Sequence, residues 1–164
     1  ETAADSDEVL RTWEAIKRRE TEQAGQRTEE SVLSGIPAAL PALQKAERLG
    51  AKAARVGFDW PRDEDVLDKI DEELAEFRDA VVSGDRAAVR EELGDVLFAL
   101  SMLARRREID AEKALEDTNR KFVRRFQAVE RELVAREIPI DRAGIELLDR
   151  LWNEAKAAER RQDA

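Results

Sequence analysis

Two short acidic segments of the chain carry residue types that can bind divalent cations. The first is Glu72-Glu73-Leu74-Ala75-Glu76-Phe77, and the second is Glu91-Glu92-Leu93-Gly94-Asp95-Val96. Acids three or four residues apart share one face of a helix, where their mutual repulsion costs about 0.2–0.5 kcal/mol per pair. The same unfavourable spacing therefore occurs twice, and each segment by itself is also compatible with a solvated face of a charge-rich helix.

The positions of the acids relative to Gly84 predict that the two segments meet. Glu76 and Glu92 each lie eight residues from Gly84, and Glu73 and Asp95 each lie eleven residues from it. An antiparallel helix hairpin that turns at Gly84 brings each pair level, at about 12 Å and 16 Å of helix length from the turn. The helical repeat also places Glu73 and Glu92 at the edge of the apolar stripes of their helices. We therefore expect the four carboxylates to converge beside the seam between the two helices.

Carboxylates gathered beside an apolar seam repel one another and lose hydration, so either their pKa values rise or a cation joins them. Oxygen ligands without His or Cys suit Mg²⁺ or Mn²⁺, and Mg²⁺ readily takes substrate phosphates as further ligands. The chain has no Cys and no His. It therefore lacks disulfides, thiolate or imidazole metal sites, a Cys nucleophile and a serine–histidine triad. The chemistry indicated is phosphate chemistry.

The elements that must position these acids are helices throughout. Apolar residues recur at helical spacing over 63–82, 86–107, 111–136 and 142–160, with Ser83-Gly84-Asp85 as a turn and Asp110 as an N-cap. Another helix is predicted to begin at Pro37 and to carry the apolar residues from Leu40 to Ala53. No segment shows the two-residue alternation of a strand. The prediction is an all-α helical bundle built on an antiparallel helix hairpin.

The first 35 residues differ in composition from the rest. Residues 6–20 fit a short helix with Leu10, Trp13 and Ile16 on one side, and a polar stretch follows to Ser34. We therefore expect an N-terminal helix and linker over 1–35 and a catalytic domain over 36–164.

Composition narrows the possible partners. The 164 residues are 41 % charged and carry a net charge of −9, which argues against a nucleic-acid-binding surface. No apolar run approaches the roughly 18–20 residues of a membrane span. We expect a cytoplasmic protein without nucleic-acid or membrane partners.

The acidic segments resemble the signature of the all-α nucleoside triphosphate pyrophosphohydrolases. Segments around them are similar to the MazG family within that group, including Gly57-Phe58-Asp59-Trp60 and Asn119-Arg120-Lys121-Phe122. The acidic signature alone is shared with dUTPases and phosphoribosyl-ATP pyrophosphohydrolases, which remain alternatives. A basic residue that relatives carry before the second acidic segment is not matched, because Ala87-Ala88-Val89 occupies that region and only Arg90 follows it.

The resemblance implies Mg²⁺-dependent hydrolysis of nucleoside triphosphates to monophosphate and pyrophosphate by a homodimer. Carried over residue by residue, it implies the metal ligands Glu73, Glu76, Glu92 and Asp95. It places Glu72 and Glu91 close to the metal and nucleotide, as candidates to position or deprotonate the attacking water. It implies nucleotide contacts from Lys69, Lys121, Arg125 and Trp152.

The polar residues of 111–136 also stand out without the resemblance. Lys121 and Arg125 lie four residues apart at the edge of the apolar stripe, from where they could reach phosphates or form an ordinary surface pair. Asn119 falls within the stripe and could orient a ligand, contact a base or be a satisfied core amide. Trp152 could stack on a base or belong to the core.

A further alternative belongs to another functional class. A helical oligomerisation or regulatory module would carry the same apolar stripes, and its acids would only be hydrated. Dependence of pyrophosphate release on Glu73 and Glu92 separates that module from an enzyme.

Overall fold

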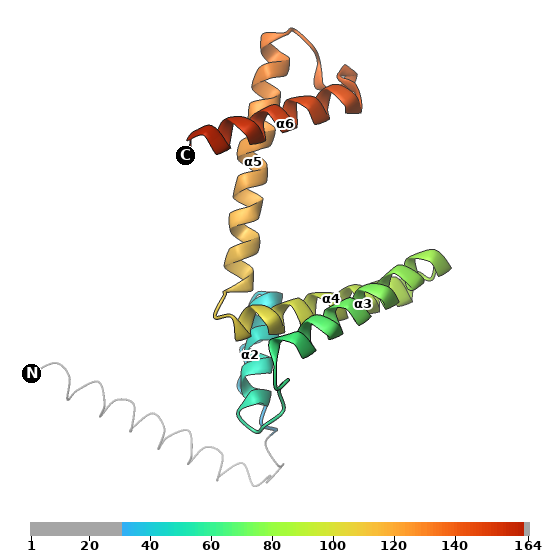
Figure 1. Ribbon diagram of the computed structural model, residues 1–164, viewed down its shortest axis with the longest axis vertical. Helices are drawn as coiled ribbons and strands as arrows, with labels where there is room; N and C mark the ends of the chain where they lie inside the picture. Colours follow the sequence, from blue (N-terminus) through green and yellow to red (C-terminus); the bar gives the residue numbers. More distant parts are fainter. Residues whose placement is uncertain (1–30, 163–164) are drawn as a thin grey trace, which may run out of the picture. The chain divides into compact units, whose positions relative to one another are not determined.

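The computed structural model describes residues 31–162, and all of its regular elements are helical (Figure 1). No strand occurs within residues 31–162, so the predicted all-α fold is confirmed. The predicted helix at 6–20, with Trp13, lies outside the described residues. The helices are α2 (Ala42–Ala54), α3 (Asp63–Ser83), α4 (Arg86–Arg106), α5 (Ala111–Ala135), the 3₁₀ helix η1 (Ile140–Arg142) and α6 (Gly144–Gln162).

Contacts between residues divide the chain between Gly35 and Ile36, and every helix named above belongs to the second unit. Within residues 31–162, no helix is both long enough and apolar enough to cross a bilayer.

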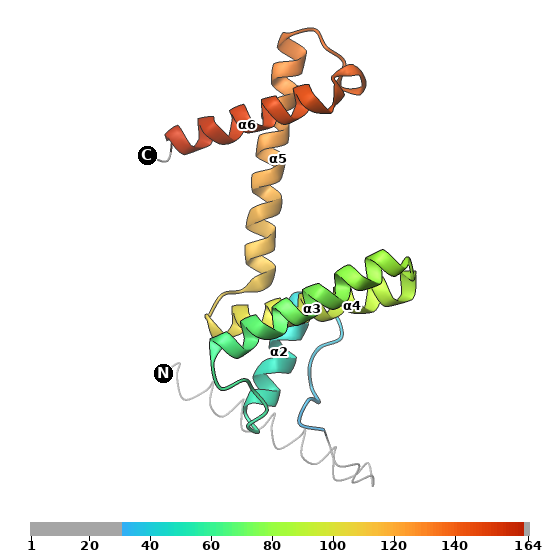
Figure 2. The same ribbon diagram turned by 45° about the vertical axis from the view of Figure 1, so that its right-hand side comes forward.

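Helices α3 and α4 form the antiparallel hairpin, and they lie side by side in Figures 1 and 2. Gly84 ends α3 with φ 75°, a left-handed conformation that glycine adopts without a Cβ penalty. Asp85 then begins α4, because its carboxylate accepts hydrogen bonds from the backbone N–H groups of Ala87 and Ala88. The turn that brings the acidic segments level is thus fixed by two adjacent residues.

The hairpin is held together by a small apolar core at its open end. Val66 and Ile70 of α3 pack with Ala99 and Met102 of α4, and all four are buried. Helix α2 packs against α4 at Gly50, where the missing side chain leaves room for Met102. Burial of these side chains fixes how α3 and α4 face each other, and hence where their acids project.

A set of ion pairs ties the loop before α3 to the end of α4. Arg105 donates to Asp59 at 2.6 Å, and Arg106 donates to Asp63 at 2.8 Å and to the carbonyl oxygen of Trp60 at 2.7 Å. Burial raises the pKa of Asp59, but the hydrogen bond and charge of Arg105 outweigh it, so the net pKa is lowered. The loop is therefore anchored while its carboxylate stays ionised.

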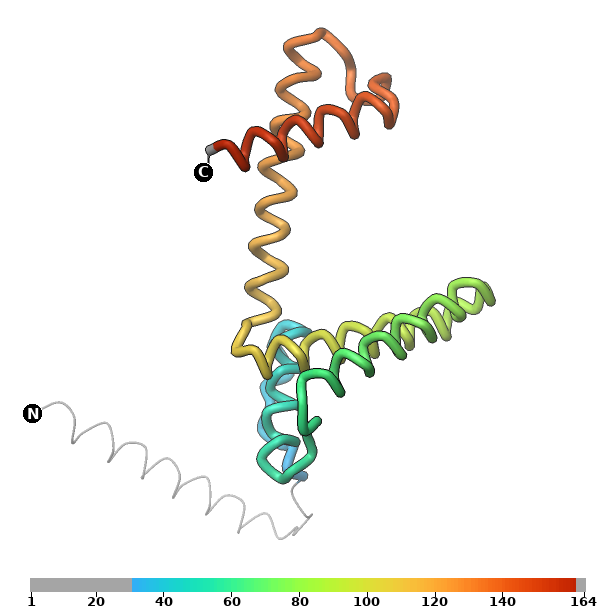
Figure 3. Tube along the Cα trace, in the orientation of Figure 1, coloured from blue at the N-terminus to red at the C-terminus, as the bar shows by residue number. Residues whose placement is uncertain are grey.

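Helices α5 and α6 form a second packed pair, and Figure 3 shows the chain reversing between them through η1. Their core consists of Val129, Leu133 and Leu151, each 2 % exposed. The predicted N-cap Asp110 is confirmed, since its carboxylate accepts from the backbone N–H of Lys113 at 2.9 Å.

Two expectations about boundaries are corrected. The helix predicted from Pro37 begins five residues later, at Ala42, and residues 38–40 form a turn. The reason is Pro41, which disfavours the α conformation at Leu40 and itself sits at the N-cap with ψ 149°. The last helix begins at Gly144 rather than at 142, because η1 intervenes.

Within residues 31–162, parts of the predicted apolar stripes of α4 and α5 are not covered. Leu93 and Leu100 of α4 are 45 % and 46 % exposed, and Phe122 of α5 is 55 % exposed. Asn119, which falls within the stripe of α5, is exposed and therefore is not a buried core amide of this chain. The stripes are apolar helix faces, as predicted, but packing within residues 31–162 leaves these side chains exposed.

Candidate functional site

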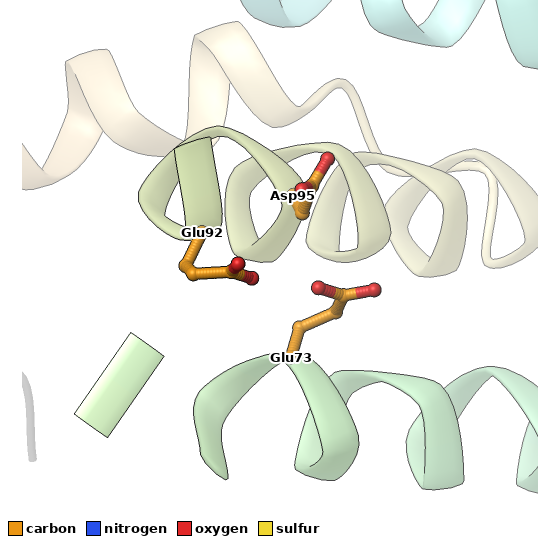
Figure 4. A group of neighbouring side chains, drawn as sticks. All are labelled: Glu73, Glu92 and Asp95. Atoms are coloured by element: carbon orange, nitrogen blue, oxygen red, sulfur yellow. The ribbon is translucent and has the colours of Figure 1, made fainter. Parts of the chain in front are cut away.

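Three of the predicted acids come together across the hairpin. Glu73 projects from α3, and Glu92 and Asp95 project from α4, with one carboxylate oxygen of each lying within 4.8 Å of the others. Figure 4 shows Glu73 and Glu92 pointing toward each other across the space between the two helices. We call these three residues the acid trio. The spacing from Gly84 predicts that four acids converge, and three of them meet here, one from α3 and two from α4.

The members of the acid trio differ in burial, and Glu92 lies among other negative charges. Glu73 is only 7 % exposed, Glu92 is half-buried and Asp95 is exposed. Burial raises the pKa of Glu92 above its usual value, and the negative charges of Glu76, Asp95, Glu73 and Glu91 raise it further. A carboxylate in such surroundings favours either a proton or a bound cation.

The donor set fits a hard divalent cation. All three side chains offer oxygen, which Mg²⁺ and Mn²⁺ prefer. Oxygens about 2.1 Å from an octahedral Mg²⁺ lie roughly 3–4 Å apart. Oxygens already within 4.8 Å of one another therefore need only small side-chain adjustments to reach that geometry.

The other predicted acids surround the acid trio without joining it. Glu76, Glu72 and Glu91 are exposed. Glu76 is near enough that its charge is the leading electrostatic contribution to the raised pKa of Glu92. Glu72 instead forms an ion pair with Lys69, whose Nζ lies 3.0 Å from Oε1 of Glu72.

Lys69 is the predicted nucleotide contact that lies next to the acid trio. Its Nζ is 2.8 Å from Oε1 of Glu73, one turn further along α3. Within residues 31–162, no other ion pair involves any of the acids of the two segments. The ammonium group of Lys69 is thus the cation that these carboxylates contact.

A second group of predicted residues gathers on α5 and α6. The Trp152 ring lies 5.1 Å from the ring of Phe122, and the guanidinium of Arg125 lies 5.9 Å from the Trp152 ring. Arg125 also donates to Glu159 at 2.7 Å. We call Phe122, Arg125 and Trp152 the aromatic cluster. Lys121 is half-buried beside it.

The acid trio and the aromatic cluster are separate groups in the described part of the chain. Among residues 31–162, no hydrogen bond, ion pair or ring contact connects one group with the other. Asn119 is exposed and belongs to neither. The structure therefore brings together three predicted metal ligands with Lys69, and separately Arg125 with Trp152.

Sequence reasoning missed Glu159 as the partner of Arg125. The two residues lie 34 positions apart on different helices, and α6 carries several other acids. Nothing in its spacing distinguishes Glu159 from them. Only the crossing of α5 and α6 selects it.

A comparison with family models gives a match over the same helices. Residues 62–129 match the MazG nucleotide pyrophosphohydrolase domain. The chain contains a MazG domain. This domain spans α3, α4 and the first three-quarters of α5, so it includes every member of the acid trio together with Lys69, Lys121 and Arg125.

Three relatives extend the similarity beyond the MazG domain. The chain is 42 % identical over 162 residues to the nucleoside triphosphate pyrophosphohydrolase of Escherichia coli, covering 96 % of this chain and 60 % of that protein. It is 38 % identical over 148 residues to the nucleoside triphosphate pyrophosphohydrolase/pyrophosphatase MazG of Thermotoga maritima, covering 90 % of this chain and 55 % of the relative. It is 42 % identical over 158 residues to the uncharacterized protein YabN of Bacillus subtilis, covering 96 % of this chain and 32 % of that protein. The chain thus spans at most about 60 % of the length of these relatives.

Proposed function

We propose that this MazG domain protein is a Mg²⁺-dependent nucleoside triphosphate pyrophosphohydrolase that releases a monophosphate and pyrophosphate. The observation that carries the proposal is the acid trio, in which two helices hold carboxylates against one another at a spacing that suits a divalent cation. The Escherichia coli and Thermotoga maritima relatives, both named nucleoside triphosphate pyrophosphohydrolases, support the same activity.

In the proposed site, Glu73, Glu92 and Asp95 hold the cation from both sides of the hairpin, and Glu76 completes the set from the next turn of α3. The bound cation supplies charge neutralisation of the triphosphate and polarises the phosphorus under attack. Mn²⁺ has the same ligand preferences and is expected to substitute. Because Glu73 is buried, its carboxylate is held by packing and needs little ordering when the cation binds.

Two exposed acids are the candidates to act on water. Glu72 and Glu91 each directly precede a member of the acid trio in the sequence and are not among the proposed metal ligands. Either carboxylate can accept a hydrogen bond from a water molecule and, as a general base, its proton. We assign the water-positioning role to this pair.

The nucleotide would be held by cationic and aromatic side chains. Lys69 lies next to Glu73 and is close enough to the acids to reach a metal-bound phosphate. Lys121 and Arg125 offer charge to the phosphates, and Arg125 can bind two phosphate oxygens at once. Trp152 is half-buried and presents an aromatic surface for a base. Asn119 is exposed on α5 and remains a candidate for a base contact.

We further propose that the active form is a homodimer. Several apolar side chains of α4 and α5 that a single chain leaves exposed belong to the predicted apolar stripes or lie next to them. These are Leu93, Leu97, Phe98, Leu100, Leu115 and Phe122. Exposed apolar side chains of this kind are typical of an interface between identical subunits. Because the acid trio and the aromatic cluster are not in contact within one chain, a second copy also provides a way to complete the nucleotide pocket.

The deciding experiment measures which product leaves. Each common nucleoside and deoxynucleoside triphosphate is incubated with the protein, with and without Mg²⁺, and pyrophosphate and orthophosphate are measured separately. We expect the parent protein to release pyrophosphate only when Mg²⁺ is present. We expect this release to be lost in the variants Glu73→Gln and Glu92→Gln. Glu64→Gln is the matched control, because Glu64 lies on the same helix and is exposed away from the acid trio.

The same measurement tests the alternatives. A strong preference for dUTP, or for phosphoribosyl-ATP when it is added to the panel, would move the protein to those branches of the superfamily. Pyrophosphate release that survives both Gln substitutions would contradict the metal role of the acid trio. No release by the parent protein would favour a non-enzymatic helical module.

A further inference from the structure

The side chain of Lys69 contacts one member of the acid trio and the neighbouring Glu72. Its Nζ lies 2.8 Å from Oε1 of Glu73 and 3.0 Å from Oε1 of Glu72. The Lys69 side chain is 35 % exposed, whereas that of Glu73 is 9 % exposed. An ammonium group therefore already contacts the most buried carboxylate of the acid trio.

The surroundings of Glu73 explain why it holds this ammonium. Carboxylate oxygens of Glu73, Glu92 and Asp95 lie within 4.8 Å of one another, so Glu73 faces two other negatively charged groups. In the described part of the chain, Lys69 is the one basic residue within ion-pairing distance of these acids. A lysine ammonium is charged at neutral pH, so Lys69 brings one positive charge into contact with Glu72 and Glu73.

A divalent cation on Glu73 must displace this contact or tolerate it. A metal ion about 2.1 Å from the carboxylate and an ammonium about 2.8 Å from it repel each other strongly at such short separation. Lys69 has a flexible four-carbon stem, so its ammonium can leave Glu73 without any movement of α3. When it leaves, it needs another anionic partner, and a metal-bound triphosphate supplies one beside the same site.

We propose that Lys69 is the resident counter-cation of the acid trio, which neutralises Glu73 before the metal binds and makes binding of the metal and of the triphosphate mutually dependent. This inference rests on the proposed function, because it presumes that the acid trio binds a divalent cation. It adds that Lys69 weakens the binding of the metal alone. Thermodynamic linkage makes the effect reciprocal: the factor by which the nucleotide raises the affinity for the metal equals the factor by which the metal raises the affinity for the nucleotide.

Binding calorimetry on the full chain with Mn²⁺ tests the proposal without any turnover. The variants are Lys69→Met, which removes the charge but keeps the length and helix propensity, and Lys69→Arg, which keeps the charge. Arg78→Met is the matched control. Arg78 lies on the same helix, is exposed and changes the net charge equally, but it does not contact the acid trio. Each protein is titrated alone and then with α,β-methylene-ATP, in which the scissile bond is blocked.

Without nucleotide, Lys69→Met should bind Mn²⁺ roughly tenfold more tightly than the parent, as expected for removing one positive charge next to a divalent ion. Lys69→Arg and Arg78→Met should stay within about twofold of the parent, because neither removes a charge that contacts Glu73. Addition of α,β-methylene-ATP should strengthen Mn²⁺ binding by the parent by a larger factor than it strengthens binding by Lys69→Met.

Two different results would separate failure of this inference from failure of the proposed function. If the parent binds Mn²⁺ and Lys69→Met binds it no more tightly than Arg78→Met, the counter-cation role of Lys69 is wrong while the metal site stands. If the parent binds no Mn²⁺ with or without α,β-methylene-ATP, the metal site and this inference fall together. Should Lys69→Met not fold by circular dichroism, Lys69→Gln carries the same test, with the same direction expected.

Discussion

Replacement of Gly50 by Ala tests how closely α2 approaches the helix that carries two of the three trio members. A Cβ at this position would lie 2.2 Å from Sδ of Met102 and 2.7 Å from its Cε. Real Cβ atoms do not come within 3 Å of another heavy atom, so Met102 has to retreat by about 1 Å. Met102 is 2 % exposed and packs against Val66, Ile70 and Ala99, which leaves little room for that movement.

The expected magnitude follows from two opposing effects. Overpacking of a filled core costs about 1–3 kcal/mol. Replacing a helical glycine by alanine returns about 1 kcal/mol. Gly50→Ala should therefore be about as stable as the parent or up to about 2 kcal/mol less stable.

Gly94→Ala is the matched comparison. Gly94 is also helical, but a Cβ there would have no atom within 4 Å. This variant should gain about 0.5–1 kcal/mol from helix propensity alone. The free energy of unfolding should thus differ between the two alanine variants by about 1–3 kcal/mol, which is the cost of the clash itself.

Urea unfolding followed by circular dichroism measures both variants, at one protein concentration and in the absence of divalent cations. A double-mutant cycle with Met102→Ala should then give a coupling energy of at least about 1 kcal/mol, because the smaller side chain removes the clash. If Gly50→Ala is stabilised as much as Gly94→Ala, or if its effect is additive with that of Met102→Ala, the close approach of α2 and α4 is refuted.

Three further predictions concern the site. Folding raises the pKa of Glu92 above its ordinary value of 4.5. The folded state therefore binds the Glu92 proton more tightly than the unfolded state does. As a result, the metal-free parent loses stability as the pH rises from 4.5 through the folded pKa. The melting temperature of Glu92→Gln in EDTA should therefore match that of the parent near pH 4 and exceed it at pH 7; a difference that does not grow with pH would show that the carboxylates are not crowded. Removal of Mg²⁺ by EDTA should abolish pyrophosphate release, and Mn²⁺ should restore it; activity that persists in EDTA would contradict a metal-dependent reaction. Binding of α,β-methylene-ATP should change the tryptophan fluorescence of the parent but not that of Trp152→Phe, and an unchanged response in the variant would place the base elsewhere.

The acidic segments were the most predictable part of the molecule. Their distances from Gly84 are a property of sequence, and a glycine turn followed by Asp85 converts those distances into a level pairing across two helices. That Glu73, Glu92 and Asp95 approach one another followed from this register. That Glu73 is buried while Asp95 is exposed did not follow, since burial depends on how the helices rotate about their axes when Val66, Ile70 and Met102 pack.

The ends of the helices and the partners of the charged side chains were less predictable than the presence of the helices. Pro37 and Pro41 both suit the start of a helix. The helix begins after Pro41, because Pro41 disfavours the α conformation at Leu40 and so interrupts a helix begun at Pro37. The pairing of Arg125 with Glu159 joins two helices 34 residues apart, and no local pattern selects it.

The sequence by itself determined the helices, the turn at Gly84, the register that places the acidic segments opposite each other, and the carboxylate oxygens that those segments offer. These are local properties, because helical periodicity, a left-handed glycine and carboxylate chemistry act over a few residues. The tertiary structure alone decided that Glu159 contacts Arg125 and that the stripe residues Leu93, Leu100 and Phe122 stay exposed. Several neighbours are equally polar or equally apolar, and only the packing of the helices decides which of them come into contact. Packing is a property of the whole set of contacts and not of any one segment.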